Sequence, residues 1–74
     1  MISEDDANEL IDMYVATAIT AQAMIKSGQF EYGPKDLDRC HRDVFADLIR
    51  ANRGATKETG EKLFDFIKQQ LRKP

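Results

Sequence analysis

The stretch MYVATAITAQAMI, from Met13 to Ile25, decides how this chain folds, because its 13 residues carry no charge. It sits within a longer segment, residues 4–26, that has the features of one helix. Ser3 is a favourable N-cap, acidic residues fill the first turn, and Gly28 can end the helix in a left-handed conformation. A membrane-spanning helix needs about 20 apolar residues, so we expect no membrane span here.

The 4–26 helix has one clear apolar side. On a helical wheel, eight residues fall within an arc of about 140°, and they form the predicted core face: Ala7, Leu10, Ile11, Tyr14, Val15, Ala18, Ala21 and Ile25. A second uncharged stripe runs beside it, made of Met13, Thr17, Thr20 and Met24. Ala16 and Ala23 lie on the far side of the helix, with Ile19 nearby. A helix without charge on any side is usually buried.

Two further helices are predicted, over residues 34–53 and 57–72. Pro34 suits a first helical position, Gly54 suits a stop, and Thr56 is a good N-cap. No stretch alternates like a strand. The sequence therefore predicts an all-α, compact three-helix bundle that forms a single helical domain over residues 1–74, with sequential helices antiparallel. Gly60 either permits close helix approach or loosens the start of the third helix.

The chain has only 74 residues, and a folded protein of this size should expose roughly 4,600 Å² and bury about 60% of its unfolded surface. The single cysteine, Cys40, excludes an internal disulfide. Association commonly compensates for such a thin core. We therefore expect a homodimer that also binds another protein, with Met13, Thr17, Ile19, Thr20 and Met24 at the contact surface. The alternative is that Ala, Thr and Gln merely make an ordinary solvent-facing helix.

Aromatic residues offer a further candidate. If Phe64 faces the core, Phe66 points outward among polar residues, as a binding hot spot does. Alternatively, both rings lie at the core margins. Phe30 and Tyr32 in the first linker are expected to close the open end of the bundle, the alternative being an aromatic clamp for a peptide.

A row of arginines marks one side of the 34–53 helix: Arg39, Arg42, Arg50 and Arg53 fall within about 80° on the wheel, with Ala46 between them. Acidic residues three or four positions away can pair with them, as Asp36–Arg39, Asp38–Arg42 and Asp47–Arg50, which predicts a solvated face. The alternative is a basic patch for an acidic protein or for nucleic acid. The third helix begins with two acids in its first five residues, which fits a DNA-recognition helix poorly.

The sequence gives little support for an enzyme. Cys40 and His41 are adjacent, so on a helix they point about 100° apart and cannot act as a nucleophile and base. Asp38 and His41 make half a metal site, and the chain has no second histidine. No phosphate loop or nucleophile elbow is present. We expect no catalytic residues, no metal and no cofactor, with Cys40 and His41 as core residues.

The charge of the chain is distributed unevenly along the sequence. The net charge is −2, but residues 1–47 carry −6 and residues 48–74 carry +4. The acidic start, MISEDDANEL, is unlike a signal peptide, and the lone cysteine fits a reducing compartment. The sequence thus predicts a non-enzymatic cytoplasmic protein, an adaptor, inhibitor or regulatory subunit, that works by protein–protein interaction. A small regulatory DNA-binding protein is the alternative.

Overall fold

The computed structural model describes residues 3–73 and confirms the all-α three-helix bundle. The helices are α1 (Glu4–Ser27), α2 (Leu37–Arg53) and α3 (Lys57–Arg72), with a 3-10 turn, η1 (Pro34–Asp36), before α2. No strand occurs among residues 3–73. α2 begins three residues later than predicted because Pro34 opens the 3-10 turn, in which the Gly33 N–H donates to the Asp36 carboxylate at 2.8 Å.

The helix ends follow the capping signals of the sequence. The Ser3 and Thr56 hydroxyls each accept a hydrogen bond, 3.1 Å long, from the backbone N–H three residues further on. Gly28 and Gly54 close α1 and α2 with φ of 68° and 67°. Only glycine adopts this left-handed conformation without strain, so these two residues fix where the helices stop.

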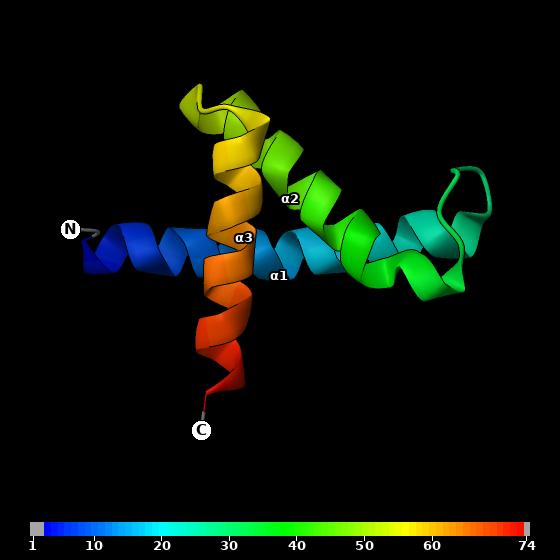
Figure 1. Cartoon of the computed structure of the whole chain (residues 1–74), viewed down its shortest axis with the longest axis horizontal. Helices are drawn as coiled ribbons and strands as arrows, with labels where there is room; N and C mark the ends of the chain where they lie inside the picture. The colour runs from blue at the N-terminus through cyan, green and yellow to red at the C-terminus, as the bar shows by residue number, and fades with distance from the viewer. Residues whose placement is uncertain (1–2, 74) are drawn as a thin grey trace.

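The three helices form two layers rather than a set of aligned rods. α2 and α3 lie together on one side of α1, and α3 crosses α1 transversely (Figure 1). The molecule measures 39 × 32 × 17 Å and is therefore flat. The antiparallel arrangement was predicted for sequential helices only, and α1 and α3, which are not sequential, cross transversely (Figure 1).

The core lies where α2 and α3 meet the middle of α1. Its buried members are Leu10, Phe45, Ile49, Phe64 and Ile67, and Tyr14 packs beside them. The rings of Phe45 and Phe64 have centroids 5.8 Å apart, and the Tyr14 ring lies 5.2 Å from Phe64. Aromatic rings at such separations pack favourably, so these side chains join all three helices.

Gly60 permits the close approach of α3 to α2. A Cβ placed on Gly60 would lie 2.8 Å from the Ala46 Cα and 3.0 Å from its carbonyl oxygen. Both residues are buried. Of the two readings of Gly60, close helix approach is therefore the one confirmed. Ala46, expected among exposed arginines, instead lies under α3.

His41 decides which side of α1 faces the core. Its Nε2 lies 2.8 Å from the Tyr14 carbonyl oxygen and 3.1 Å from Thr17 Oγ1. Thr17 is only 3% exposed, whereas Ile11 and Val15 are 40% and 52% exposed. The predicted core face is confirmed for Leu10 and Ala21 but was wrong for Ile11 and Val15. The observed face is rotated by roughly 70° about the helix axis, toward Thr17, which bonds the buried histidine.

The first linker is attached to α2 by Tyr32 rather than by Phe30. The Tyr32 hydroxyl donates to Asp43 at 2.7 Å, and the Arg39 guanidinium lies 4.7 Å from the Tyr32 ring centroid. The hydrogen bond to Asp43, with desolvation, raises the pKa of Tyr32 to about 12. Phe30 is half exposed, so it does not close the end of the bundle as expected, whereas Tyr32 lies against α2.

Candidate interaction surface

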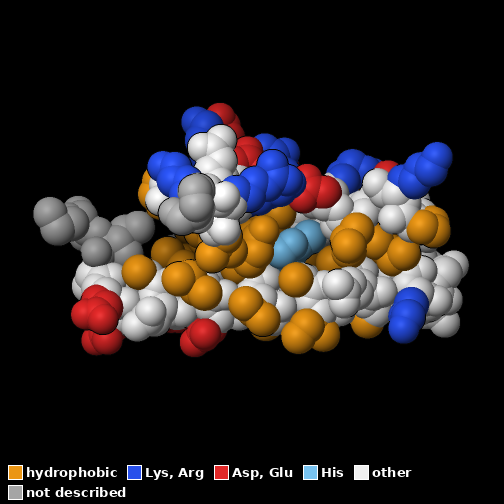
Figure 2. All heavy atoms as spheres, turned by 90° about the horizontal axis from the view of Figure 1, so that it is seen from below, with side chains coloured by type: hydrophobic (Ala, Val, Ile, Leu, Met, Phe, Trp, Pro, Cys, Tyr) orange, Lys and Arg blue, Asp and Glu red, His pale blue; other side chains and the backbone are white. Residues whose placement is uncertain are grey.

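Exposed apolar side chains gather on α1 and on the neighbouring end of α3. On α1 they recur every four residues, at Ile11, Val15 and Ile19, and on α3 they are Phe66 and Leu71. Each is between 40% and 64% exposed. Figure 2 views this side of the molecule and shows a hydrophobic band along α1, below the layer of α2 and α3. We call these five residues the apolar band.

A groove lies in the angle where α3 crosses α1. Its walls are almost wholly apolar and come from the first half of α1 and the second half of α3: Ala7, Leu10, Ile11, Leu63, Phe66, Ile67, Gln70 and Leu71. The groove exists because α3 projects past α1 instead of lying along it (Figure 1). Contiguous apolar surface that is hollowed in this way is typical of a binding site.

A second hollow follows at the other end of α1. It is lined by Ile19, Gln22, Ala23, Ile25, Lys26, Pro34 and Leu37. Ile19 belongs both to this hollow and to the apolar band, so apolar surface continues along most of α1. Leu37 is also partly exposed there, at 39%.

The predicted contact residues of α1 are placed differently from one another. Ile19 and Thr20 are exposed as expected, whereas Thr17 is buried beneath His41. Met13 packs against the core, and Met24 is half-buried. The expectation for Thr17 was wrong, because a hydroxyl that bonds His41 inside the fold does not lie at an external surface.

The exposure of Ile11, Val15 and Leu71 was not predicted from the sequence. Ile11 and Val15 were predicted in the core because an assignment from apolar spacing alone places isoleucine and valine inside in preference to threonine. The available signal was the pairing of one buried histidine with a threonine, since a buried imidazole needs a hydrogen-bond partner. Phe66 is exposed at the rim of the groove while Phe64 is fully buried, which matches the first of the two readings of these rings.

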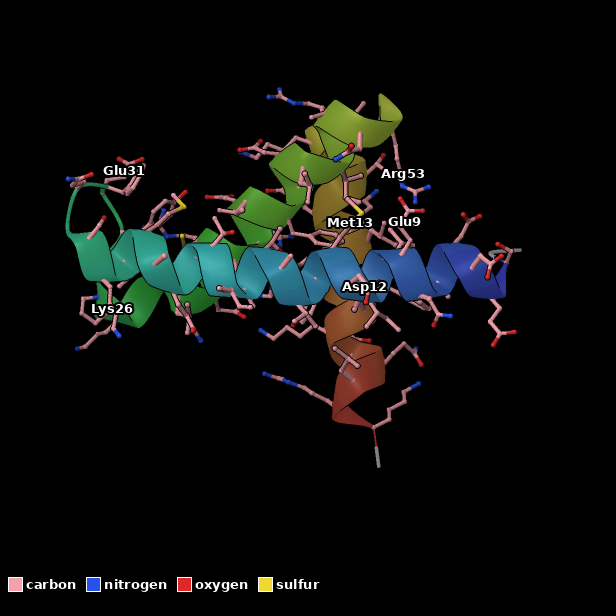
Figure 3. All side chains as sticks on the ribbon, turned by 180° about the vertical axis from the view of Figure 1, so that it is seen from behind. Glu9, Asp12, Met13, Lys26, Glu31 and Arg53 are labelled. Atoms are coloured by element: carbon pink, nitrogen blue, oxygen red, sulfur yellow. The ribbon has the colours of Figure 1, made fainter. Side chains whose placement is uncertain are left out.

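The arginines of α2 are each paired with carboxylates. Arg42 donates two hydrogen bonds to Asp65 of α3, at 3.1 and 2.9 Å, and this pair raises the pKa of Arg42. Arg53 lies 3.4 Å from Glu9 of α1, and Figure 3 shows the two side chains pointing toward one another. These pairs link helices, so they do more than solvate one face as predicted.

The other two arginines, Arg39 and Arg50, pair with acids of η1 and of α2 respectively. Arg39 lies 3.5 Å from Asp36, and Arg50 lies 3.9 Å from Asp47. Both pairs have the i,i+3 spacing that the sequence suggested. The predicted pair of Asp38 with Arg42 does not form, because Asp38 bonds Lys68 of α3 instead. The basic row is thus interleaved with acids.

Cys40 and His41 occupy the interior and do not face one another as a reactive pair. Burial raises the pKa of the Cys40 thiol and lowers that of His41. A thiol with a raised pKa is a poor nucleophile. The Cys40 sulfur lies 3.9 Å from the Ala21 carbonyl oxygen, so it links α2 to α1. Both residues pack as the core residues expected from the sequence.

Comparison with protein-family models, curated proteins and solved structures finds no match. Within residues 3–73, no group of three or more His, Cys, Asp or Glu side chains is placed to hold a metal ion. None of the described helices has the length and apolar character needed to cross a bilayer.

Proposed function

We propose that this chain is a non-enzymatic protein that acts by binding other proteins and that works as a homodimer in the cytoplasm. The apolar band is the observation that carries the proposal. Single exposed apolar residues are ordinary on protein surfaces, but a contiguous apolar patch with a groove typically marks an interaction site. Phe66 has the character of an interface anchor, since aromatic residues dominate binding energies.

Two observations favour a protein partner over DNA. The arginines that would contact phosphate already pair with carboxylates. The apolar band lies on α1 and α3, away from most of that row, and hydrophobic side chains contribute little to phosphate binding. Regulatory roles such as adaptor or inhibitor fit a small binding protein of this kind.

Sedimentation equilibrium at micromolar concentrations tests the dimer. We expect the native chain to sediment as a dimer and Ile19→Glu to sediment as a monomer with unchanged helical circular dichroism. Ala16→Glu is the matched control, because Ala16 is also exposed on α1 but lies outside the apolar band. A native chain that stays monomeric across the concentration range would overturn the homodimer.

A further inference from the structure

The exposed side of α1 carries a pattern that reads the same from either end. Val15 is at its centre, and Ile11 and Ile19 lie four residues to either side. Each of the three is at least 40% exposed. Two antiparallel copies of such a helix would place Val15 against Val15 and each Ile11 against an Ile19.

The symmetric spacing about Val15 continues to both ends of α1, where the two paired residues carry opposite charges. Asn8 and Gln22, both amides, lie seven residues from Val15, and Glu4 and Lys26 lie eleven residues from it. All four are exposed. Neither Glu4 nor Lys26 forms an ion pair within the part of the chain that is described. Figure 3 shows Lys26 on the edge of α1 opposite Met13.

These seven positions share one stripe. On a helical wheel they fall within about 80°, and they are spaced by steps of four or three residues averaging about 3.7. That average is close to the 3.6 residues per turn of a straight helix. Because the average is only slightly above 3.6, a slight right-handed supercoil keeps two copies of α1 in contact along the whole stripe.

Charge distinguishes the two ways of pairing α1 with itself. In an antiparallel pair Glu4 faces Lys26 at both ends, which is attractive. In a parallel pair Glu4 faces Glu4, amid an acidic first turn that also contains Asp5 and Asp6, and Lys26 faces Lys26. Like charges in these positions repel, so self-association is favoured in the antiparallel orientation.

The surface area of the chain is consistent with a missing neighbour of this size. The folded chain exposes 5350 Å², whereas a monomer of its mass should expose roughly 4,600 Å². The excess is close to the roughly 800 Å² that each partner buries in a standard interface. A second copy would thus restore the burial expected for a stable protein.

We infer that a second copy docks antiparallel along α1, about a two-fold axis beside Val15. This inference rests on the proposed homodimer and specifies its geometry. Ile19 of the second copy then lies against Ile11, at the edge of the groove bordered by Phe66 and Leu71. The two-fold axis makes the contact self-complementary, so the contact between Ile11 and Ile19 forms twice. The assembly therefore closes as a dimer.

Cysteine cross-linking with a short bis-maleimide distinguishes the orientations. Val15→Cys should cross-link with itself, and a mixture of Glu4→Cys and Lys26→Cys chains should cross-link with one another. Glu4→Cys alone should not, because its two copies would lie about 33 Å apart at 1.5 Å per residue. The native Cys40 is fully buried and serves as the unreactive background. Efficient cross-linking of Glu4→Cys with itself would overturn the inference.

Charge exchange gives an independent test that does not depend on cysteine reactivity. Glu4→Lys or Lys26→Glu alone should weaken the dimer about tenfold at low salt, since each places two like-charged pairs at the interface. The double variant Glu4→Lys with Lys26→Glu should recover native affinity. Asp5→Lys is the control, because it removes an acid from the same first turn while lying off the stripe.

The outcomes separate the inference from the proposed function. A monomeric native chain overturns the homodimer and the inference together. A native dimer whose affinity is unchanged by either single substitution keeps the homodimer and overturns the antiparallel α1 geometry. A dimer weakened by each single substitution and rescued by the double variant supports both.

Discussion

The Nε2 atom of His41 on α2 lies 2.8 Å from the carbonyl oxygen of Tyr14 on α1. This contact crosses the interface between the two layers, and the His41 and Phe64 rings also pack at an interplanar angle of 88°, with centroids 4.8 Å apart. Burial favours the neutral imidazole and lowers the pKa of His41, and it outweighs the hydrogen bond to the Tyr14 carbonyl, which favours the protonated form.

The first prediction concerns the pH dependence of stability. Burial lowers the pKa of His41 in the folded chain, so below about pH 6.5 the unfolded chain binds a proton that the folded chain does not. Stability should therefore be constant above that pH and fall as the pH drops below it toward the folded-state pKa. Thermal unfolding followed by circular dichroism measures this. His41→Gln, which removes the chain's only histidine, should flatten the slope; an equally steep slope in that variant would contradict the prediction.

The second prediction concerns the hydroxyl of Thr17. Thr17→Val keeps the side-chain shape but leaves His41 without one of its two neighbouring oxygens, so we expect a loss of about 1 kcal/mol in the free energy of unfolding. Thr20→Val removes an exposed hydroxyl that bonds only the Ala16 carbonyl, and it should change stability by less than about 0.5 kcal/mol. Urea denaturation of both variants checks the difference, and equal effects would argue against a buried role for Thr17.

The third prediction concerns the contact of Gly60 with Ala46. Gly60→Ala should gain about 1 kcal/mol of helix propensity, yet the new methyl would overlap Ala46. Overpacking of this kind costs about 1–3 kcal/mol, so the net effect should be destabilising. Lys62→Ala, at an exposed site of the same helix, provides the comparison without overlap. A more stable Gly60→Ala variant would show that α3 can move away from α2 at little cost.

The fourth prediction concerns the thiol of Cys40. The side chain is fully buried and its pKa is raised by burial, so the folded chain should react with a thiol reagent only when it opens. The modification rate should rise steeply with added urea and follow unfolding. Rapid labelling in the absence of urea would contradict the burial of Cys40.

The fifth prediction concerns the pairing of Arg42 with Asp65. Replacing either residue by alanine should lower the denaturation midpoint slightly, and the double replacement should cost less than the two single effects added together. The coupling should decrease with added salt because both groups are partly exposed. Arg50→Ala, which breaks only a 3.9 Å pair within α2, should show little effect. Additive single effects would indicate that the pair contributes nothing to α2–α3 packing.

Local signals in the sequence were sufficient to locate the helices. Ser3, Gly28, Gly54 and Thr56 mark helix ends by their own backbone and side-chain chemistry, and each functions as predicted. Such signals depend on neighbouring residues only, so they can be read without knowledge of the tertiary structure.

The packing of the helices against one another could not be predicted from such local signals. The uncharged circumference of α1 allowed several faces to meet the core, and the choice among them depends on Thr17 and His41, which are 24 residues apart. The transverse path of α3 depends on Gly60 and Ala46, whose roles become clear only when the two helices are brought together. Of the five α1 residues predicted at a contact surface, Ile19 and Thr20 are therefore exposed, Met13 and Met24 are partly buried, and Thr17 is buried.

The 17 Å thickness of the molecule has a consequence for how it responds to change. With two layers of helix, a single α1 backbone separates Thr17 in the interior from Val15 outside. Because Thr17 and Val15 are on the same helix, a rotation of α1 about its axis would move both side chains together. A rotation of α1 that accompanied protonation of His41 would therefore reorient Val15 on the outer surface, and a rotation caused by a contact at that surface would displace Thr17 from His41.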